Sequence, residues 1–531
     1  MRHLVPSAAA VAFLIAGCGA GDAAGSSAQA GGTLTVAVTS DPQCLDPQQA
    51  GSSDAITVNR QFVDSLTDHD PDTGKLGGWL ATSWEADPKA TSFTFHLREG
   101  ATFSDGTPVD AQAVKDNFDG LVKLGAKAVQ AATYLSGYRE SVVVDPRTVR
   151  VEFAKPNAQF LEATSTTSLG LVAKSSLAQP AADRCANGVV GSGPFLLEQY
   201  TRNQQVVQRR RDGYAWSPAR ITNRGAAYLD RLVFKIVPEA NVRVGLLESG
   251  QADAVLGVGP QDTDRVKRAG LVISARPNPG LVYGINVNRS RPLVADGAVP
   301  RAIQRAVDRR QVVDTILSPD YHPATSVLSA PTLGYVDLGG KLSADPAAAT
   351  EILTTAGWVP GADGMRVRNG QRLSLVVRYY TPDSGLAQSS LELIQQQLKK
   401  IGVDVVLKPT PVAQAIQTFK DGDYDLIWGN ASAADPDILR NYFTVQGLNA
   451  VRLTAGPLQD ALYAQAGEGD PARRAQQVAL AQQLLLDDGW AIPVYEPTTV
   501  VGLSAKVRGV RFDAASRLQF IDVQRAGKGG K

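Results

Sequence analysis

Three cysteines and four histidines are the residues of this 531-residue chain best suited to metal, redox or nucleophilic chemistry. The cysteines are Cys18, Cys44 and Cys185, and none lies in a CxxC pair or beside a histidine. A zinc site or a Ser-His-Asp triad needs several such side chains together, and after His3 only His69, His96 and His322 remain. No GxSxG, HExxH or P-loop sequence is present either. We therefore expect no enzyme, no metal site and no cofactor.

Cys18 follows a segment with the layout of a secretory signal peptide. An apolar run over residues 4–16, broken only by Pro6 and Ser7, leads through small residues to Cys18. This layout resembles the bacterial lipobox, in which the cysteine is lipid-modified and becomes the new N-terminus. A plain signal peptide with a chance cysteine is the alternative. We expect residues 1–18 to be a signal peptide with a lipobox, and a mature protein that is lipid-anchored at Cys18 to the cell membrane, outside the cytoplasm.

Residues 19–32 are almost entirely Gly, Ala, Ser and Gln, which predicts a flexible tether. No later apolar run reaches the ~20 residues that cross a bilayer, so lipid is the expected anchor. The net charge of +1 indicates neither a nucleic-acid-binding surface nor a polybasic membrane patch. The roughly 500 remaining residues are too many for one core, so we expect two or three domains.

Cys44 and Cys185 remain after Cys18 is assigned to the anchor. Disulfides persist outside the cytoplasm, so we expect these two residues to pair. The bridge would close a loop of about 140 residues and contribute up to ~4–5 kcal/mol in the chain-entropy model. Two buried free thiols are the alternative.

Short strands alternate with amphipathic helices along the chain, which predicts a mixed α/β fold. Residues 33–38 alternate with period two and predict a strand. Asp110 is expected to cap a helix whose apolar face is Val114, Phe118, Leu121 and Val122. Further helices are expected over 303–317, over 391–401 with Gly402 at its end, and over 475–486, and a strand over 403–407.

The segment FHLREGATFSDGTPVDAQAVKDNF, residues 95–118, resembles the signature of the family 5 extracytoplasmic solute-binding proteins. These are the dipeptide-, oligopeptide- and nickel-binding components of ABC importers. Further matches follow in family order at residues 45–47, 191–195, 211–216, 246–253, 356–358, 363–364, 397–403, 423–426 and 492–495. No single motif decides the matter, but the ordered set covers essentially the whole mature chain and is highly specific.

The resemblance implies a two-lobe periplasmic-binding-protein fold of type II, with a ligand cleft between the lobes. Lobe one is expected over residues 33–52, 186–276 and 496–531, with an extra inserted domain over 53–185, and lobe two over 277–495. Crossovers near 275–279 and 496–501 would form a hinge, where prolines suit extended connectors. Closure about such a hinge encloses a ligand and gives the form that a permease can recognise.

The cleft wall implied by the resemblance includes residues 429–436. In peptide binders of the family, an aspartate four residues before the matching proline pairs with the ammonium group of the ligand, and here that position is Ser432. A desolvated ammonium group needs a charged partner, so Ser432 disfavours a free peptide N-terminus. Ser432 and Asn430 suit hydroxyl or amide groups of a ligand, or else they only shape a turn.

Four other residues are candidates for ligand binding. Trp428 is expected either to stack on the ligand or to belong to the core. Asp435 either faces the cleft or shapes the turn before Pro436, and Tyr283, just past the first crossover, lies in the cleft or in the core. Cys44 precedes a loop that lines the cleft in the family, and we interpret it as structural.

Together these features predict a lipid-anchored substrate-binding protein that captures a small solute and performs no chemistry on it. The first expectation for the solute is a short peptide or a peptide-like compound. The expected partners are that ligand, the membrane through the lipid anchor, and an ABC permease with its ATPase subunits, and the protein is expected to be a monomer. The alternatives are a binder of a sugar or other polar metabolite for import, an extracytoplasmic solute sensor, and a surface hydrolase.

Overall fold

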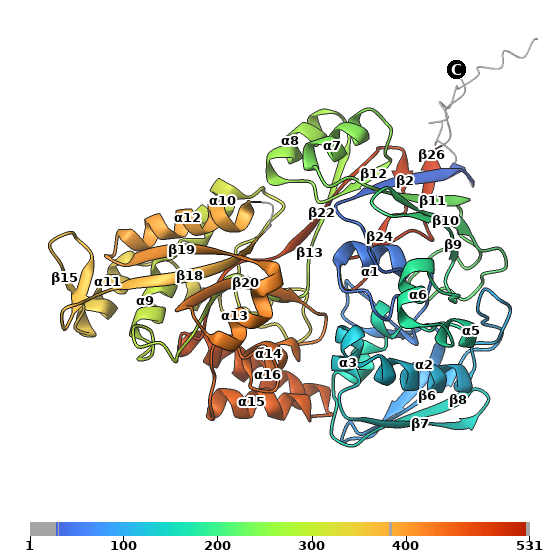
Figure 1. The fold of residues 1–531 in the computed structure, drawn as a ribbon, viewed down its shortest axis with the longest axis horizontal. Coiled ribbons are helices and arrows are strands. Elements are labelled where there is room, and N and C mark those ends of the chain that lie inside the picture. Colours follow the sequence, from blue (N-terminus) through green and yellow to red (C-terminus); the bar gives the residue numbers. More distant parts are fainter. Residues whose placement is uncertain (1–27, 30, 382–384, 527–531) are drawn as a thin grey trace, which may run out of the picture.

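The computed structural model describes residues 28–29, 31–381 and 385–526, which form two lobes joined by extended strands (Figure 1). The expected anchor Cys18 and the signal peptide lie outside the described residues. The mixed α/β fold predicted from the sequence is confirmed, with one large sheet in each lobe. No helix within the described residues is both long and apolar enough to cross a bilayer.

Lobe one is built on a seven-stranded sheet. Its strands, in spatial order, are β13 (Val272–Pro277), β22 (Thr498–Leu503), β12 (Ala254–Leu256), β2 (Thr33–Val38), β11 (Arg231–Ile236), β10 (Gln205–Arg210) and β9 (Phe195–Thr201). The strand predicted over residues 33–38 is β2, and its alternate residues Leu34, Val36 and Val38 are fully buried. Helices α7 (Ala240–Glu248) and α8 (Thr263–Arg268) belong to this lobe, and α1 (Ser53–Arg60) and α6 (Ala181–Asn187) lie at its junction with the inserted domain.

A four-stranded antiparallel sheet forms the inserted domain beside lobe one. Its strand order is β5 (Ala81–Ala86), β6 (Ser92–Leu97), β8 (Thr148–Phe153) and β7 (Tyr138–Asp145), preceded by the pair β3 (Thr67–His69) and β4 (Leu76–Gly78). Its helices are α2 (Ala111–Leu124), α3 (Val129–Tyr134), α4 (Phe160–Ala163) and α5 (Lys174–Leu177).

Helix α2 begins as predicted, because the Asp110 side chain accepts the N–H of Ala113 at 2.8 Å. Val114, Phe118 and Leu121 are fully buried. The prediction for Val122 is wrong, since its side chain is 47% exposed. One residue advances a helix by about 100°, which turns Val122 away from the face that Leu121 buries.

Lobe two is built on a five-stranded sheet. Its strands, in spatial order, are β19 (Asp404–Pro411), β18 (Ser374–Thr381), β20 (Leu426–Ser432), β14 (Gly280–Val287) and β21 (Ala491–Tyr495). Its helices are α9 (Ala298–Ala306), α10 (Arg309–Ile316), α11 (Pro346–Thr355), α12 (Leu386–Lys399), α13 (Ala415–Asp421), α14 (Ile438–Phe443), α15 (Pro457–Ala466) and α16 (Pro471–Asp487). The helices predicted near 391–401 and 475–486 are α12 and α16, and Gly402 follows α12 with φ +81°.

The single helix predicted over residues 303–317 is instead two helices, α9 and α10. Asp308 separates them, because its backbone is extended and its side chain accepts the N–H of Gln311 at 2.9 Å. This is the geometry of a helix N-cap, which starts a new helix rather than continuing the old one.

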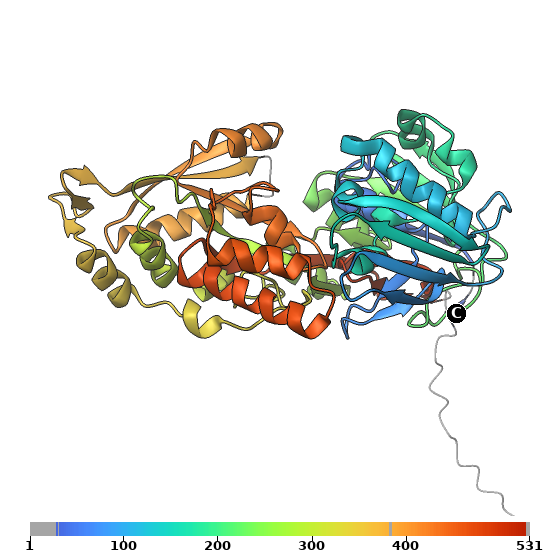
Figure 2. The ribbon, with the colours of Figure 1, turned by 90° about the horizontal axis from the view of Figure 1, so that it is seen from below.

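The main chain passes between the two large sheets at two places. Residues 278–279 connect β13 to β14, and residues 496–497 connect β21 to β22. The two crossovers lie side by side, since Asn278 N–H donates to Pro497 O at 2.6 Å and Thr499 Oγ1 donates to Asn278 Oδ1 at 2.7 Å. Figure 2 shows the extended strands that run between the two lobes.

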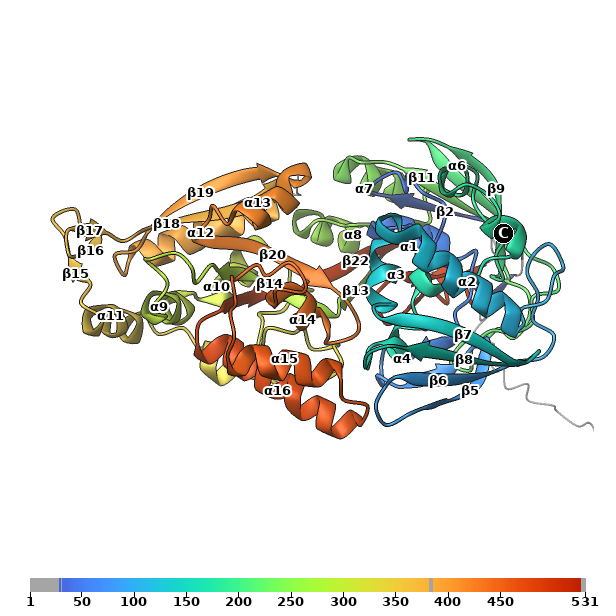
Figure 3. The same cartoon turned by 60° about the horizontal axis from the view of Figure 1, so that its bottom comes forward.

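The inserted domain also touches lobe two, away from the crossovers. The N–H of Ala158 donates to Ala466 O at 3.0 Å, at the end of α15. Figure 3 shows α15 and α16 extending towards the inserted domain. On the opposite side, Lys267 Nζ of lobe one lies 3.6 Å from Asp320 Oδ2 of lobe two. The lobes therefore contact each other around the space that they enclose.

Cys44 and Cys185 are joined by a disulfide across a sequence separation of 141. Around it, Leu45 N–H donates to Cys185 O at 2.9 Å, and Asn59 Nδ2 donates to Cys44 O at 3.0 Å. The bridge therefore attaches the loop before α1 to α6, and the Asn59 bond ties α1 to the same loop. Helix α1 contributes residues to the cleft described next.

Candidate ligand-binding site

A cavity of about 740 Å³, here called the cleft, lies between the lobes. Lobe one and the inserted domain contribute Gly51, Ser53, Ile56, Gln130 and Arg517, and the crossovers contribute Asn278, Pro497 and Thr498. Most of the remaining wall belongs to lobe two. Ligand pockets for small molecules range over about 300–1,000 Å³, so the cleft has room for a ligand of several tens of atoms.

The lobe-two wall of the cleft is aromatic. Seven of its described lining residues carry aromatic rings: Tyr283, Tyr321, Tyr380, Phe419, Trp428, Tyr442 and Tyr495. Tyr283 and Tyr495 are cross-strand partners on β14 and β21, with ring centroids 4.9 Å apart. Tyr283 also stacks near Trp428, with centroids 6.0 Å apart and planes inclined by 21°. Neighbouring strands thus bring rings together that are far apart in the sequence.

Trp428 lies in the core and also borders the cleft. Its side chain is 2% exposed and packs in the lobe-two core, yet it also lines the cleft. Its Nε1–H is buried and has no hydrogen-bond partner among the described residues. An indole N–H of this kind can donate to a ligand atom.

Asn430 and Ser432 occupy the end of β20, and both line the cleft. Neither side chain makes a hydrogen bond with another described residue. Ser432 pairs across the sheet with Gly280, whose φ is +116°. A Cβ atom at Gly280 would lie 2.3 Å from Ala431 O, so only glycine allows this close approach of the strands.

Asp435, three residues after Ser432, is not brought to the cleft. It is buried behind the wall, where its carboxylate binds both terminal nitrogens of Arg474 at 2.6 and 2.8 Å. Its Oδ1 also accepts the N–H of Asp437 at 2.7 Å. Cys44 does not line the cleft either, and its sulfur is used by the disulfide. The structure therefore gives Asp435 and Cys44 structural contacts.

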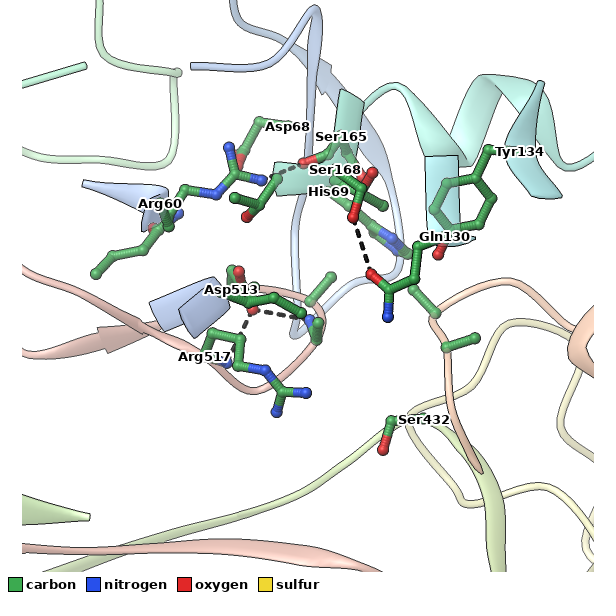
Figure 4. Close-up of a pocket in the computed structure, with 18 of the residues that line it drawn as sticks. Arg60, Asp68, His69, Gln130, Tyr134, Ser165, Ser168, Ser432, Asp513 and Arg517 are labelled. Carbon is green, nitrogen blue, oxygen red and sulfur yellow. Dashed lines mark hydrogen bonds between the residues drawn. The ribbon is translucent and has the colours of Figure 1, made fainter. Parts of the chain in front are cut away.

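A smaller cavity of about 70 Å³ adjoins the Ser432 end of the cleft and shares Ile56, Gln130, Ser432 and Arg517 with it. Its lobe-one side carries charged and titratable groups, namely Arg60, Asp68, His69, Asp513 and Arg517 (Figure 4). Arg60 and Asp68 are already partnered: Arg60 donates to Ser65 and Ser165, and Asp68 accepts two bonds from Arg220.

This architecture agrees with the match to known families. The model of the bacterial extracellular solute-binding proteins, family 5 (middle region) matches residues 75–452. The chain belongs to this family. Its members are solute-binding proteins rather than a known class of enzymes, and the family resemblance seen in the sequence is thereby confirmed.

Two Escherichia coli K12 relatives illustrate the likeness of this family 5 protein. The probable D,D-dipeptide-binding periplasmic protein DdpA is 26% identical over 499 residues, covering 90% of this chain and 91% of the relative. The nickel-binding periplasmic protein is 27% identical over 392 residues, covering 70% of this chain and 72% of the relative.

Solved structures share the two-lobe fold. NikA from Brucella suis, in complex with Fe(III)-EDTA, gives a TM-score of 0.81 at 24% identity and covers 93% of this chain and 100% of its own. DppA from Helicobacter pylori, in complex with a peptide, gives a TM-score of 0.75 at 20% identity. The match covers 94% of this chain and 99% of that structure's chain.

The described lining of the cleft carries little formal charge. Of the described residues that line it, Arg517 alone carries a formal charge, and none is an aspartate or a glutamate. Nothing in the local sequence distinguishes Arg517 from an exposed arginine in a turn, so sequence reasoning did not select it. Within the described residues, no group of three or more His, Cys, Asp or Glu side chains is arranged to hold a metal ion.

A buried acid–base pair lies where the inserted domain meets lobe two. His69 Nδ1 and Glu162 Oε2 are 3.1 Å apart, and both side chains are largely buried. Burial raises the pKa of Glu162 to about 8. The negative charge of Asp435, across the contact, also raises this pKa, and the positive charge of Arg474 lowers it. Burial lowers the pKa of His69. Near neutral pH this pair is therefore mostly uncharged.

Proposed function

We propose that this family 5 protein captures a short peptide or a peptide-like compound in the cleft and delivers it to an ABC import permease with its ATPase subunits. The observation that carries the proposal is a cleft of about 740 Å³ with an aromatic wall, enclosed by two lobes that the main chain joins at two crossovers. The names of relatives add support, since they include dipeptide- and glutathione-binding proteins.

The proposed capture involves closure of the two lobes about a hinge at residues 275–279 and 496–501. Lobe one would comprise residues 33–52, 186–276 and 496–531, the inserted domain 53–185, and lobe two 277–495. Tyr283, Trp428, Asn430 and Ser432 are the residues proposed to contact the ligand from lobe two. The aromatic rings supply apolar contact area, while Asn430 and Ser432 can bond amide or hydroxyl groups.

Identifying the ligand that the protein carries from the cell tests the proposal most directly. The mature protein should be purified without denaturation and examined by native mass spectrometry, with fragmentation of any released compound. We expect a bound compound that contains amide bonds and that returns unaltered from the protein. A sample unfolded, dialysed and refolded serves as the ligand-free control. A bound sugar, or a compound converted into a product, would contradict the proposal.

The proposal includes attachment to the cell membrane through lipid at Cys18. Metabolic labelling with a fatty-acid probe should tag the wild-type protein and leave Cys18→Ala untagged. Equal labelling of both proteins, or of neither, would remove the lipid anchor from the proposal. The solute-binding function would be unaffected by that result.

A further inference from the structure

Arg517 lies in the turn of a hairpin that lobe one directs into the cleft. The hairpin consists of β24 (Arg511–Phe512) and β25 (Leu518–Gln519). Asp513 fixes the turn, because its Oδ1 accepts the N–H groups of Ala515 and Arg517 at 2.9 Å each. Ser516 Oγ donates to Pro277 O at 2.8 Å and ties the turn to the first crossover. The backbone of Arg517 is thus held in place before any ligand arrives.

The side chain of Arg517 is largely buried, and its guanidinium group has no bonded partner among the described residues. The residue is 9% exposed, its Nε is buried with no hydrogen bond, and it forms no ion pair with a described carboxylate. Arg243, buried to 4% exposure, shows the usual solution, since it donates to four backbone carbonyls. A buried charge without such bonds is costly, so the position of Arg517 favours an anionic partner.

The negative charges of Asp513 and Asp54 act on Arg517 without forming an ion pair with it, and hydrogen-bond donors lie beside it in the cleft. Figure 4 shows its guanidinium group directed away from Arg60 and towards the side on which Ser432 lies. Gln130 also lines this end, and its Oε1 accepts a bond from Ser168 Oγ at 2.8 Å. The Gln130 amide nitrogen is thereby left as a donor, and the Ser432 hydroxyl is another. The carboxylate nearest in the chain, Asp513, uses Oδ1 for its own turn.

We propose that the Ser432 end of the cleft is an anion subsite, in which Arg517 binds a carboxylate group of the solute with Gln130 and Ser432 as additional donors. The inference rests on the proposed capture of peptide-like solutes and specifies their class: compounds whose acidic group, rather than an ammonium group, occupies this end. The guanidinium group of an arginine and a carboxylate form two parallel charge-assisted hydrogen bonds. Where water is excluded, these bonds strongly favour ligands with a carboxylate over ligands without one.

The test uses the full mature protein, freed of endogenous ligand by unfolding and refolding, and isothermal titration calorimetry. The probes are apolar dipeptides, each in four forms: free, N-acetylated, C-amidated and blocked at both ends. Wild-type protein should bind the forms with a free carboxylate at least tenfold more tightly than their amides, while N-acetylation should change affinity less. Arg517→Gln should remove this preference, and Arg517→Lys should keep part of it.

Arg508→Gln is the matched control, because Arg508 is an exposed arginine in the same C-terminal segment. It should behave as wild type, and ligand-free Arg517→Gln should unfold at the wild-type temperature or above. Equal binding of acids and amides by wild type, or an unchanged preference in Arg517→Gln, would overturn the anion subsite but leave peptide capture intact. If no form of any dipeptide binds wild type, peptide capture itself fails and the subsite with it.

Discussion

The two walls of the cleft differ in the kind of contact that they offer. The lobe-two wall presents aromatic rings and no charge, whereas the lobe-one side presents Arg517 and, in the adjoining small cavity, further charged groups. Aromatic surface accepts many ligands with similar affinity, while a buried charge rejects ligands that lack its counterpart. We infer that lobe two supplies contact area and that lobe one decides which charge is accepted.

Two buried arginines make the same contrast at the level of single residues. Arg474 in lobe two is saturated by the carboxylate of Asp435, and Arg517 in lobe one has no such partner. The paired arginine holds the wall together, and the unpaired one is available to a ligand. Four experiments can break or sharpen this comparison.

Removal of the disulfide should have the largest effect on stability. The Cys44→Ser/Cys185→Ser protein should lose about 4–5 kcal/mol of unfolding free energy, because the bridge closes a long loop and supports α1 of the lobe-one wall. Denaturant unfolding of ligand-free protein measures the change. A thiol assay on denatured, unreduced mature protein is the control, and two titratable thiols besides Cys18 would contradict the bridge.

Arg474→Leu should have the second largest effect on stability. It should lower the unfolding free energy by about 3–5 kcal/mol, because it leaves the buried Asp435 carboxylate unpaired. Ligand-free Arg517→Gln should lose no stability, since no bonded partner is abandoned. Urea unfolding of both variants compares them directly. Similar losses in the two proteins would show that Arg517 also serves the fold and would weaken the contrast between the walls.

The Glu162–His69 contact predicts a pH dependence of stability. Folded protein keeps the Glu162 proton up to its raised pKa of about 8, while an unfolded chain releases it near 4.5. The folded state therefore binds more protons between these values, so stability falls as pH rises, by at most about 1.4 kcal/mol per pH unit. The lowered pKa of His69 opposes this decline near pH 7, because an unfolded histidine of pKa 6.5 is still partly protonated there, and the opposition fades towards pH 8.

Urea unfolding at pH 7.0, 7.5 and 8.0 should show this decline for wild type and a smaller one for Glu162→Gln. The difference between the two slopes isolates Glu162 from other groups that titrate in this range. Parallel slopes would mean that Glu162 is ionised in the folded protein and that the contact with lobe two carries a charge.

Ser432→Asp should produce the smallest of the four effects, a change of about tenfold in ligand affinity, equal to about 1.4 kcal/mol. The new carboxylate would face Arg517, so acidic dipeptides should bind less well. In the Ser432→Asp/Arg517→Gln protein the same carboxylate should favour free ammonium groups instead. Calorimetry with N-acetylated and C-amidated dipeptides measures this reversal of preference between carboxylate and ammonium groups. Submicromolar binding of unblocked peptides by wild type, lost on acetylation, would contradict our interpretation of Ser432.

Much of the fold could be predicted because it depends on short-range patterns. Period-two alternation in β2, the Asp110 cap of α2 and the left-handed Gly402 after α12 all reflect interactions within a few residues. The ordered family motifs then predicted the two-lobe architecture. The break between α9 and α10 was missed because a cap at Asp308 competes with an otherwise continuous apolar pattern.

The sequence by itself determined the family, the α/β fold and the stretch around residues 428–436 as part of the cleft. Only the tertiary structure decided which of these side chains face the ligand space. Ser432 and Asp435 are three residues apart, yet the turn after β20 sends one into the cleft and the other to Arg474 on α16. Arg517 meets the same space from a hairpin far along the chain. Such placements follow from packing between distant segments, which no local pattern of residues encodes.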